Sequence, residues 1–330
     1  MSQWHLVTED FPPGFTGGIA SWAHDLAQAL CERGAAVRVV ARHTGDTQSY
    51  DDAQPWTTHR ARGRHWSRWR GRWAQLSLSR HLKAKDRVIF SHWGLAQNSV
   101  GMMRRRDARY ALTFHGSDLT QLSEAPAALH AVVAQAAALL PVSQFLASEL
   151  TRLGLVNTSD PRVRVLPMPI PDLPARTGQG HGLVCVARPT ALKGIPRVVA
   201  LARALDMPLT LVGPTDPGLG ILSREDAHAA MARAAACVLL PQTTELGLGA
   251  EGLGMVLLEA AAQGVPVIGC DTGGVREAVG PGLLIDPDSP DLSAIRSFLQ
   301  RPDAGAQARA WVRTAHGPAA TLRTLQAAMP

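Results

Sequence analysis

The segment EGLGMVLLEAAAQGVPVIG, residues 251–269, contains the pattern that decides the fold. Glycines precede an apolar helical run, and a further glycine separates that run from the apolar residues of a buried strand. A helix followed at once by a buried strand is typical of parallel βαβ architecture. Two carboxylates, Glu251 and Glu259, stand in this segment, and Glu259 interrupts the apolar run MVLLEAAA. A carboxylate at that place indicates a polar task in addition to packing.

The same alternation of strand and helix patterns extends along the whole chain. Strand patterns occur at residues 4–8, 36–41, 87–90, 110–114, 138–142, 183–187, 209–213, 237–241 and 265–269. They predict two α/β domains of the doubly wound, Rossmann-like type that face a central cleft: residues 1–165 and residues 183–330. The proline- and glycine-rich residues 166–182 read as the linker between them. The last helix is a candidate to pack back on the first domain.

Composition indicates a globular protein, with 330 residues, 46% hydrophobic and 18% charged. The net charge of +6 is uneven, because residues 1–165 hold 20 Lys and Arg against 13 Asp and Glu. This excess predicts an anionic partner for the first half of the chain. The start, MSQWHLVTED, lacks the basic and apolar regions of a signal peptide, and His130, Gln135 and Pro141 interrupt the longest apolar run. We therefore expect a soluble protein that is cytoplasmic or peripheral at the inner face of the membrane.

The loops that follow the predicted strands carry the chemistry. Gly17 and Gly18 come directly before a helix, where the backbone can approach an anion closely. His115 follows a buried strand in TFHGSDL. Arg188 and Lys193 lie in VARPTALKG before another helix, and two cations at a helix start suit a diphosphate.

The fourth loop is the segment quoted first. Gly254 opens its helix, so the amides of Met255 and Val256 would face an anion. Glu259, about one turn further along, could accept two hydrogen bonds from a ribose diol. Glu251, on the loop, could reach sugar hydroxyls on the far side of the phosphates.

Together these residues resemble glycosyltransferase family 4, whose members are retaining enzymes of the two-domain GT-B fold. The resemblance rests on the two glutamates of EGLGMVLLE, on the arginine, lysine and glycine of ARPTALKG, and on HGSD. FPPGFTGGI and LPVSQFLASEL also have the look of the family, and the motifs occur in the family's order along nearly the whole chain.

The resemblance implies roles for particular residues. It assigns donor binding to Gly17, Gly18, Arg188, Lys193, Gly254, Met255, Val256 and Glu259. Glu251 would hold the donor sugar near its C3 and C4 hydroxyls, and His115 would contact it near the reacting centre. The leaving diphosphate itself would take the acceptor proton, with no metal and no cofactor. The donor is expected to be a UDP- or GDP-sugar bound by residues 183–330. The acceptor is expected to be a cell-envelope glycolipid or a natural product bound by residues 1–165.

The sequence departs from the family pattern in two respects. Leu253 stands where an aromatic residue is common, and the chain is short for the family. The shortness predicts a small acceptor or a pared-down acceptor site.

Two further sequence patterns suggest a metal site and a surface for an anionic partner, but each also has a structural interpretation. DPD, residues 286–288, matches the metal-binding Asp-x-Asp of another glycosyltransferase fold, but it lies late in a loop, so we expect no metal there. Residues 60–73, RARGRHWSRWRGRW, place Trp66, Trp69 and Trp73 on one face if they are helical. We expect this helix to pack its tryptophans on the sheet with solvated arginines, the alternative being contact with anionic lipid or a phosphorylated acceptor. Nucleic acid is not expected, because no recognition motif accompanies the basic run.

Two other functional classes remain open at this stage. A sugar-nucleotide epimerase or hydrolase on the same fold would need an additional pair of proton-transfer groups. A non-enzymatic basic protein that binds membranes or nucleic acid would use residues 60–73 alone.

Overall fold

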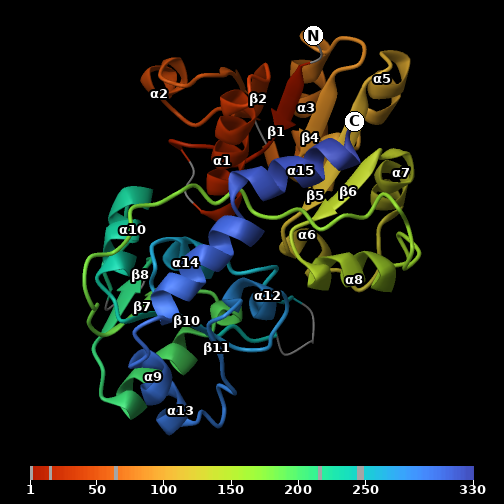
Figure 1. Ribbon diagram of the computed structural model, residues 1–330. Helices are drawn as coiled ribbons and strands as arrows, with labels where there is room; N and C mark the ends of the chain where they lie inside the picture. Colours follow the sequence, from red (N-terminus) through yellow and green to blue (C-terminus); the bar gives the residue numbers. More distant parts are fainter. Residues whose placement is uncertain (1–2, 15–16, 63–65, 215–217, 244–248) are drawn as a thin grey trace. The chain divides into compact units, whose positions relative to one another are not determined.

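The computed structural model describes residues 3–14, 17–62, 66–214, 218–243 and 249–330, without the side chains of residues 66–68. The chain forms two compact units (Figure 1). Unit 1 consists of Met1–Pro169 together with Pro318–Pro330, and unit 2 consists of Ile170–Gly317. The boundary falls within the proline-rich segment 166–182, and the last thirteen residues return to unit 1.

Unit 1 is built on a six-stranded parallel sheet. Its strands are β1 (Trp4–Val7), β2 (Val37–Arg42), β3 (Thr57–Ala61), β4 (Arg87–Phe90), β5 (Arg109–Phe114) and β6 (Ala138–Pro141). The order β3-β2-β1-β4-β5-β6 places β1 and β4 at the centre, where the direction of winding reverses. In this register Leu6 of β1 pairs with Val39 on one side and Ile89 on the other.

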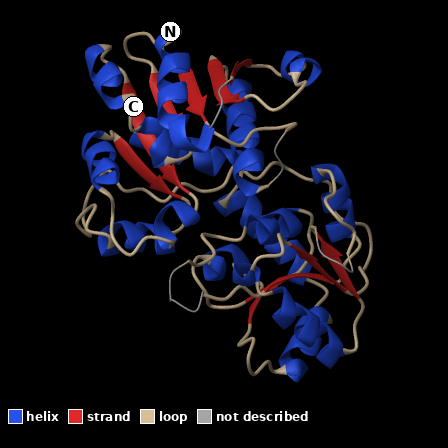
Figure 2. Cartoon of the chain, turned by 180° about the vertical axis from the view of Figure 1, so that it is seen from behind, coloured by secondary structure: helices blue, strands red, loops and turns tan. Residues whose placement is uncertain are grey.

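Helices cover both faces of this sheet, as Figure 2 shows. They are α1 (Gly18–Glu32), α2 (Gln48–Asp52), α3 (Trp66–Ser79), α4 (Trp93–Ala96), α5 (Val100–Arg105), α6 (Ser117–Thr120), α7 (Ala127–Gln135), α8 (Gln144–Arg152) and the C-terminal α15 (Pro318–Ala328). Helix α15 packs beside α1 (Figure 1) and buries Leu322 and Leu325. The hydroxyl of Thr321 donates to the carbonyl of Pro167, 2.9 Å away.

Unit 2 is built on a five-stranded parallel sheet in the order β11-β10-β9-β7-β8. Its strands are β7 (Leu183–Val186), β8 (Leu209–Val212), β9 (Ala236–Leu239), β10 (Val267–Gly269) and β11 (Leu283–Leu284). Its helices are η1 (Ala191–Lys193), α9 (Ile195–Leu205), α10 (Arg224–Ala232), α11 (Met255–Ala262), α12 (Val275–Val279), α13 (Leu292–Leu299) and α14 (Ala304–Ala315). The chain passes from β7 to β8 on one side and then to β9 on the other, so the ligand crevice of this topology lies beyond β7 and β9.

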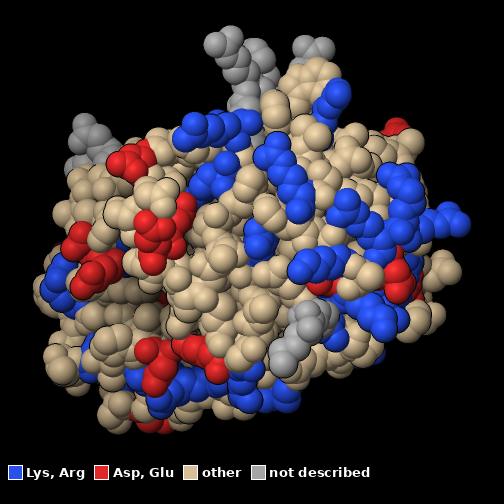
Figure 3. Space-filling model, turned by 90° about the horizontal axis from the view of Figure 1, so that it is seen from above, with Lys and Arg blue, Asp and Glu red and all other residues tan. Residues whose placement is uncertain are grey.

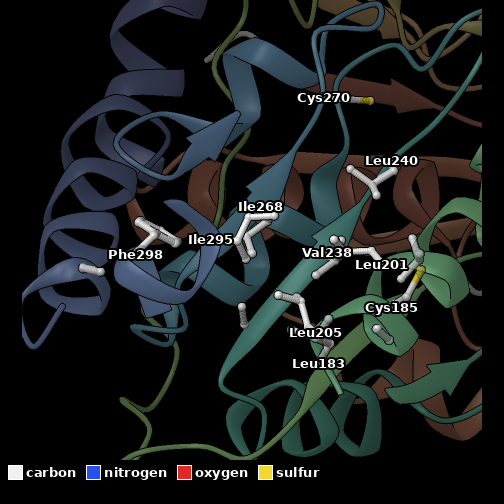
Figure 4. Packing of buried hydrophobic residues seen from close by; sticks show 14 residues of the cluster. Leu183, Cys185, Leu201, Leu205, Val238, Leu240, Ile268, Cys270, Ile295 and Phe298 are labelled. Carbon is white, nitrogen blue, oxygen red and sulfur yellow. The ribbon is translucent and has the colours of Figure 1, made fainter. Parts of the chain in front are cut away.

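The core of unit 2 joins strand and helix residues that are far apart in the sequence. Leu183 of β7, Val238 of β9 and Ile268 of β10 pack against Leu201 of α9 and Ile295 of α13 (Figure 4). All five are at most 3% exposed. These strands are buried on both faces, and this explains why they read as short, continuous apolar runs.

The predicted fold class is confirmed, and the nine predicted strands are present with ends that shift by no more than two residues. Strands β3 and β11 were not predicted. β3, with the sequence TTHRA, is a polar, half-exposed edge strand, and β11 is apolar but only two residues long, too short to give a strand pattern. Among the described residues, no helix is long and apolar enough to cross a membrane.

Candidate functional site

The loop after β7 brings Arg188 and Lys193 to the carboxyl end of the unit 2 sheet. Arg188 is exposed, and Lys193 lies in the short helix η1. Gly194 follows with φ of 61°, and a Cβ at this position would lie 1.9 Å from the carbonyl oxygen of Leu240. The loop after β7 therefore lies directly on the end of β9, which only glycine permits.

Glu251 lies opposite this loop, and its carboxylate forms an ion pair with the Lys193 ammonium. The backbone of Glu251 is fixed as well, since its carbonyl accepts from the amide of Gly274 at 2.9 Å. Gly273 has φ of 60°, and a Cβ there would come within 2.3 Å of that carbonyl. Loops after three strands, β7, β9 and β10, thus determine where this carboxylate lies.

The helix of the quoted segment begins where the sequence predicts. Gly254, with φ of 94°, is the N-cap of α11, and no side chain caps the helix. The first amides, those of Met255 and Val256, therefore point toward the end of the sheet, and the helix dipole places partial positive charge there. Lys193 and Arg188 belong to the loop after β7, so two cations and a helix start lie at the carboxyl end of this sheet, with Lys193 paired to Glu251.

Glu259 is the buried carboxylate of α11, with 7% of its surface exposed. Its Oε1 lies 3.1 Å from a guanidinium nitrogen of Arg224 and 3.5 Å from Nε2 of His228, both on α10. The sequence predicts that this carboxylate accepts two hydrogen bonds from a ribose diol. In the structure Oε1 accepts a hydrogen bond from Arg224, Nε2 of the nearby His228 makes none, and Oε2 makes no hydrogen bond within the described residues.

Arg224 and His228 were missed by the sequence analysis. They occupy positions i and i+4 of one helix, so they lie on one face. The i, i+4 spacing indicates that the two side chains share a helix face, but nothing in the sequence indicates that this face lies against Glu259. The contact depends on the packing of α10 against α11.

In unit 1, Gly17 and Gly18 form the start of α1 after the loop that follows β1. Gly17 has φ of 135°, both glycines are exposed, and no side chain caps the helix. Residues 15 and 16, which precede them, lie outside the described part of the chain.

His115 lies at the carboxyl end of β5, and its hydrogen bonds define its tautomer. The Thr113 hydroxyl lies 3.1 Å from the carbonyl of Phe90, which can only accept. The same hydroxyl lies 3.0 Å from Nε2 of His115, so it accepts from that nitrogen. Nδ1 then carries a lone pair. Burial, together with the nearby His92, lowers the pKa of His115 to about 3, so the ring is neutral at physiological pH.

Asp118 positions His115, and the sequence analysis quoted it in HGSD without giving it a role. Its Oδ1 accepts from the backbone amides of His115, at 3.2 Å, and Gly116, at 2.8 Å. Burial raises the pKa of Asp118 to about 6 although these bonds oppose the shift. The edge of Trp22 packs on the ring of His115 with centroids 4.5 Å apart. The imidazole orientation is therefore fixed by its backbone and by an aromatic neighbour.

The aspartates of the DPD segment, residues 286–288, are engaged within the protein. Asp288 of the DPD segment pairs with Arg197, and Asp286 accepts the backbone amide of Asp288. Among the described residues, no group of three or more His, Cys, Asp or Glu is placed to hold a metal ion.

In segment 60–73, the prediction of three tryptophans on one helix face lies partly outside the described residues, because the Trp66 side chain is not described. Trp69 is 44% exposed and Trp73 is half-buried, so the tryptophans do not all pack on the sheet as expected. Not all the arginines are solvated either, since Arg60 pairs with Asp51 and the side chain of Arg60 is 7% exposed.

Two doubly wound parallel sheets, each with a glycine-bounded helix start and polar residues at its carboxyl ends, define the class of GT-B glycosyltransferases. Comparison with known proteins agrees. Residues 16–172 match the family model described as Glycosyltransferase Family 4, and residues 219–313 match the model described as Glycosyl transferases group 1. The chain belongs to this family of transferase enzymes.

Solved structures with the same fold cover nearly the entire chain. Sucrose-phosphate synthase from Thermosynechococcus elongatus superposes with a TM-score of 0.75 and 18% identity over 98% of both chains. A glycosyltransferase involved in avilamycin A biosynthesis gives a TM-score of 0.69 and 16% identity over 98% of this chain and 96% of the other. At these identities the likeness concerns the fold alone.

Two curated relatives match shorter segments. A GDP-mannose-dependent alpha-(1-6)-phosphatidylinositol monomannoside mannosyltransferase of Mycobacterium tuberculosis is 41% identical over 80 residues, 22% of this chain and 21% of the relative. A GDP-mannose-dependent monoacylated alpha-(1-6)-phosphatidylinositol monomannoside mannosyltransferase of Corynebacterium glutamicum is 36% identical over 102 residues, 28% of this chain and 27% of the relative. The matched segments thus span less than a third of either relative.

Proposed function

We propose that the protein transfers a sugar from a nucleoside-diphosphate sugar to an acceptor hydroxyl, with retention of the anomeric configuration and without a metal ion. One observation carries the proposal: the loops after β7 and β9 bring Lys193 and Glu251 into an ion pair at the carboxyl end of the unit 2 sheet, and α11, the helix that carries Glu259, begins in the same loop as Glu251. A sugar nucleotide needs groups for hydroxyls, for a diphosphate and for a ribose, and we propose Glu251, Lys193 with the start of α11, and Glu259 for these three tasks.

The positively charged groups of the proposed site bind the diphosphate. The amides of Met255 and Val256 and the ammonium of Lys193 stabilise the diphosphate, whose negative charge grows as it leaves. Arg188, exposed on the same loop, adds a second cation. Fixed positive charge of this kind does the work that a divalent cation does in other transferases, which is why we propose metal independence.

The two carboxylates hold the uncharged parts of the donor. Oε2 of Glu259 accepts a ribose hydroxyl, while Arg224 keeps the carboxylate in place through Oε1. Glu251 accepts hydroxyls of the sugar. Its carboxylate pairs with Lys193, so a diphosphate that binds the ammonium would compete for it and leave the carboxylate for the sugar.

The reaction breaks the bond between C1 of the sugar and the diphosphate oxygen and forms a bond from C1 to the acceptor oxygen on the same face. The acceptor proton passes to the leaving diphosphate. His115 is neutral and offers a lone pair at Nδ1, so its role is to accept a sugar hydroxyl and not to act as an acid.

The curated relatives suggest the first substrates to test. Both are named GDP-mannose-dependent, so GDP-mannose is our first candidate donor and UDP-glucose the comparison. Both act on phosphatidylinositol mannosides, so we propose a lipid-linked glycan as acceptor class ahead of a soluble natural product.

Donor binding can be tested without the acceptor. Saturating GDP or UDP should raise the melting temperature of the protein, because a ligand that binds only the native state stabilises it. Lys193→Met should abolish most of this shift, whereas Arg203→Met, which removes an exposed cation of α9, should leave it unchanged.

Turnover separates the proposed function from its alternatives. Product formation that requires an acceptor, yields the donor's anomeric configuration by NMR and persists in EDTA supports the proposal. Donor consumption without any acceptor would instead indicate an epimerase or hydrolase. Absence of a thermal shift with every nucleotide sugar would contradict the donor site itself.

A further inference from the structure

A group of cations lies at the end of unit 1 where strands β4 and β5 begin. We call it the basic edge, and it consists of seven exposed residues: Arg80, Lys83, Lys85, Arg104, Arg105, Arg106 and Arg109. They come from the end of α3, the turn before β4 and the segment from α5 to β5. In the part of the chain that the structure describes, none of the seven forms an ion pair.

Backbone contacts make the basic edge one surface. The guanidinium of Arg106 donates to the carbonyl of Leu82 at 2.6 Å. The amide of Lys85 donates to the carbonyl of Asp107 at 2.9 Å, and the amide of Arg109 donates to the carbonyl of Asp86 at 3.1 Å. Residues 80–87 and 104–109 therefore lie side by side, and their charges add.

Few carboxylates offset these charges. Asp86 is 2% exposed, and its oxygens accept from the amides of Gln3 and Lys83 and from the ring of His5. Asp107 is the one exposed carboxylate within these two segments. Seven cations against this single anion give a formal charge of +6, which equals the net charge of the whole chain. The rest of the protein is therefore electrically balanced.

The basic edge lies at the amino ends of the unit 1 strands, not at their carboxyl ends. All strands of the sheet are parallel, so the amino ends of β4 and β5 lie opposite the carboxyl ends where ligands bind in this fold. Figure 3, which views the molecule from above Figure 1, shows Lys and Arg gathered over one side of this face and Asp and Glu mostly toward the other. These cations thus serve a partner other than the sugar nucleotide.

Helix α3 adds apolar groups that lead into the basic edge. Trp69 and Leu76 are 44% and 47% exposed, and they lie seven residues apart, on one face of the helix. Arg72 lies between them with its guanidinium 6.0 Å from the Trp69 ring. Arg80 continues the same face at the end of α3. An exposed tryptophan and leucine interleaved with arginines suit the boundary between lipid headgroups and acyl chains.

We propose that the basic edge and the outer face of α3 dock the protein on the surface of an anionic lipid bilayer. Each Lys or Arg near an anionic bilayer is attracted to it, and the attractions of the seven cations add because they lie on one surface. Nucleic acid would also attract the charge, but Trp69 and Leu76 favour a bilayer, because a solvated phosphate backbone offers no apolar layer for a leucine. This surface is larger than residues 60–73 and does not depend on the proposed activity.

Sedimentation with vesicles tests this surface directly. The full chain should bind vesicles of phosphatidylcholine with about 30% phosphatidylglycerol, bind pure phosphatidylcholine vesicles at least about tenfold less, and be released by about 0.5 M NaCl. Arg104→Glu/Arg105→Glu should weaken binding about tenfold or more. Trp69→Ala/Leu76→Ser should weaken it at low salt and remove the binding that survives in moderate salt.

A matched control separates local from global charge. Arg203→Glu/Arg233→Glu changes the net charge of the chain by the same amount on unit 2, at two exposed arginines, and should leave binding unchanged. Equal losses in both double variants, no difference between the two vesicle types, or tighter binding to duplex DNA than to anionic vesicles would each overturn the proposal. Circular dichroism of every variant confirms that folding is intact.

Discussion

Glu259 shows how a single residue acquires a role from its neighbours. A carboxylate that is 7% exposed is tolerated because a guanidinium nitrogen of Arg224 lies 3.1 Å from Oε1, with Nε2 of His228 3.5 Å away. Oε2 makes no hydrogen bond within the described residues, so under the proposed function it is the oxygen that accepts a ribose hydroxyl. The contact at Oε1 would fix the orientation of this acceptor before the donor binds.

Replacing this carboxylate should therefore affect donor binding most. Glu259→Gln keeps the shape but removes the charge, and a charge-assisted hydrogen bond contributes about 1.5–3 kcal/mol, so the donor KM should rise about 10- to 100-fold with a smaller change in kcat. Steady-state kinetics at varied donor concentration measures this. Glu225→Gln, an exposed glutamate of α10, is the control. A KM within twofold of wild type would contradict the ribose assignment.

We expect the contribution of His115 to kcat to be independent of pH. Since its pKa lies near 3, the ring stays neutral throughout the range in which the enzyme can be assayed. His115→Asn shortens the side chain and removes the acceptor at Nδ1, and kcat should fall about tenfold, the value of one lost hydrogen bond. The ratio of wild-type to variant kcat should stay constant from pH 5.5 to pH 8.5. A ratio that collapses near pH 6 would show that the protonated ring is the active form.

At the scale of elements, the site depends on loops that touch one another at backbone distance. Gly194 is the clearest case, because its left-handed φ of 61° is combined with a Cβ position 1.9 Å from the carbonyl oxygen of Leu240. The loop that holds Lys193 cannot move away without losing its contact with β9. Side-chain size at this glycine thus determines the geometry of the donor crevice.

Gly194→Ala should destabilise unit 2 by about 2–4 kcal/mol, the sum of left-handed strain and a backbone clash. Gly178→Ala provides the comparison, since Gly178 has φ of 77° but nothing within 4 Å of a Cβ, and it should cost only about 1 kcal/mol. Urea unfolding followed by circular dichroism measures both. Equal losses would mean that strain, and not the contact with β9, dominates.

At the scale of the whole molecule, the periodicity of apolar residues predicted most of the strands and helices. It did not predict which elements pack against one another. Buried parallel strands are visible as apolar runs, so β1 and β9 were found, whereas the polar edge strand β3 was not. The strand-end glycines and charges located candidate site residues, which remain to be tested by mutation. Arg224 and His228 could not be assigned, because sequence spacing does not tell which helix faces which. The basic edge was likewise hidden, since residues 80–87 and 104–109 meet only in the folded unit.

Buried histidines make the stability of unit 1 depend on pH. Burial lowers the pKa of both His92 and His115 to about 3, from about 6.5 in the unfolded chain. The unfolded chain therefore takes up protons first as the pH falls below 6.5. The free energy of unfolding is therefore not reduced by these histidines above pH 6.5, and it falls progressively as the pH drops toward 3. At pH 5 the loss is about 2 kcal/mol for each of the two histidines. Asp118, whose pKa is raised to about 6, acts in the opposite sense and returns only about 1.4 kcal/mol between pH 7.5 and pH 5.

Unit 1 should consequently be less stable at pH 5 than at pH 7.5 by a few kcal/mol. Tryptophan fluorescence in urea reports on this unit, because seven of the eight tryptophans belong to it. Nδ1 of His92 caps α4 by accepting the amide of Gly94, and asparagine is also a good N-cap, so His92→Asn should preserve folding while it reduces the pH dependence by about 2 kcal/mol. His130→Asn, at an exposed position of α7, should leave the pH dependence unchanged. If both variants lose stability with falling pH as the wild type does, the acid sensitivity arises from groups other than the His92 cap.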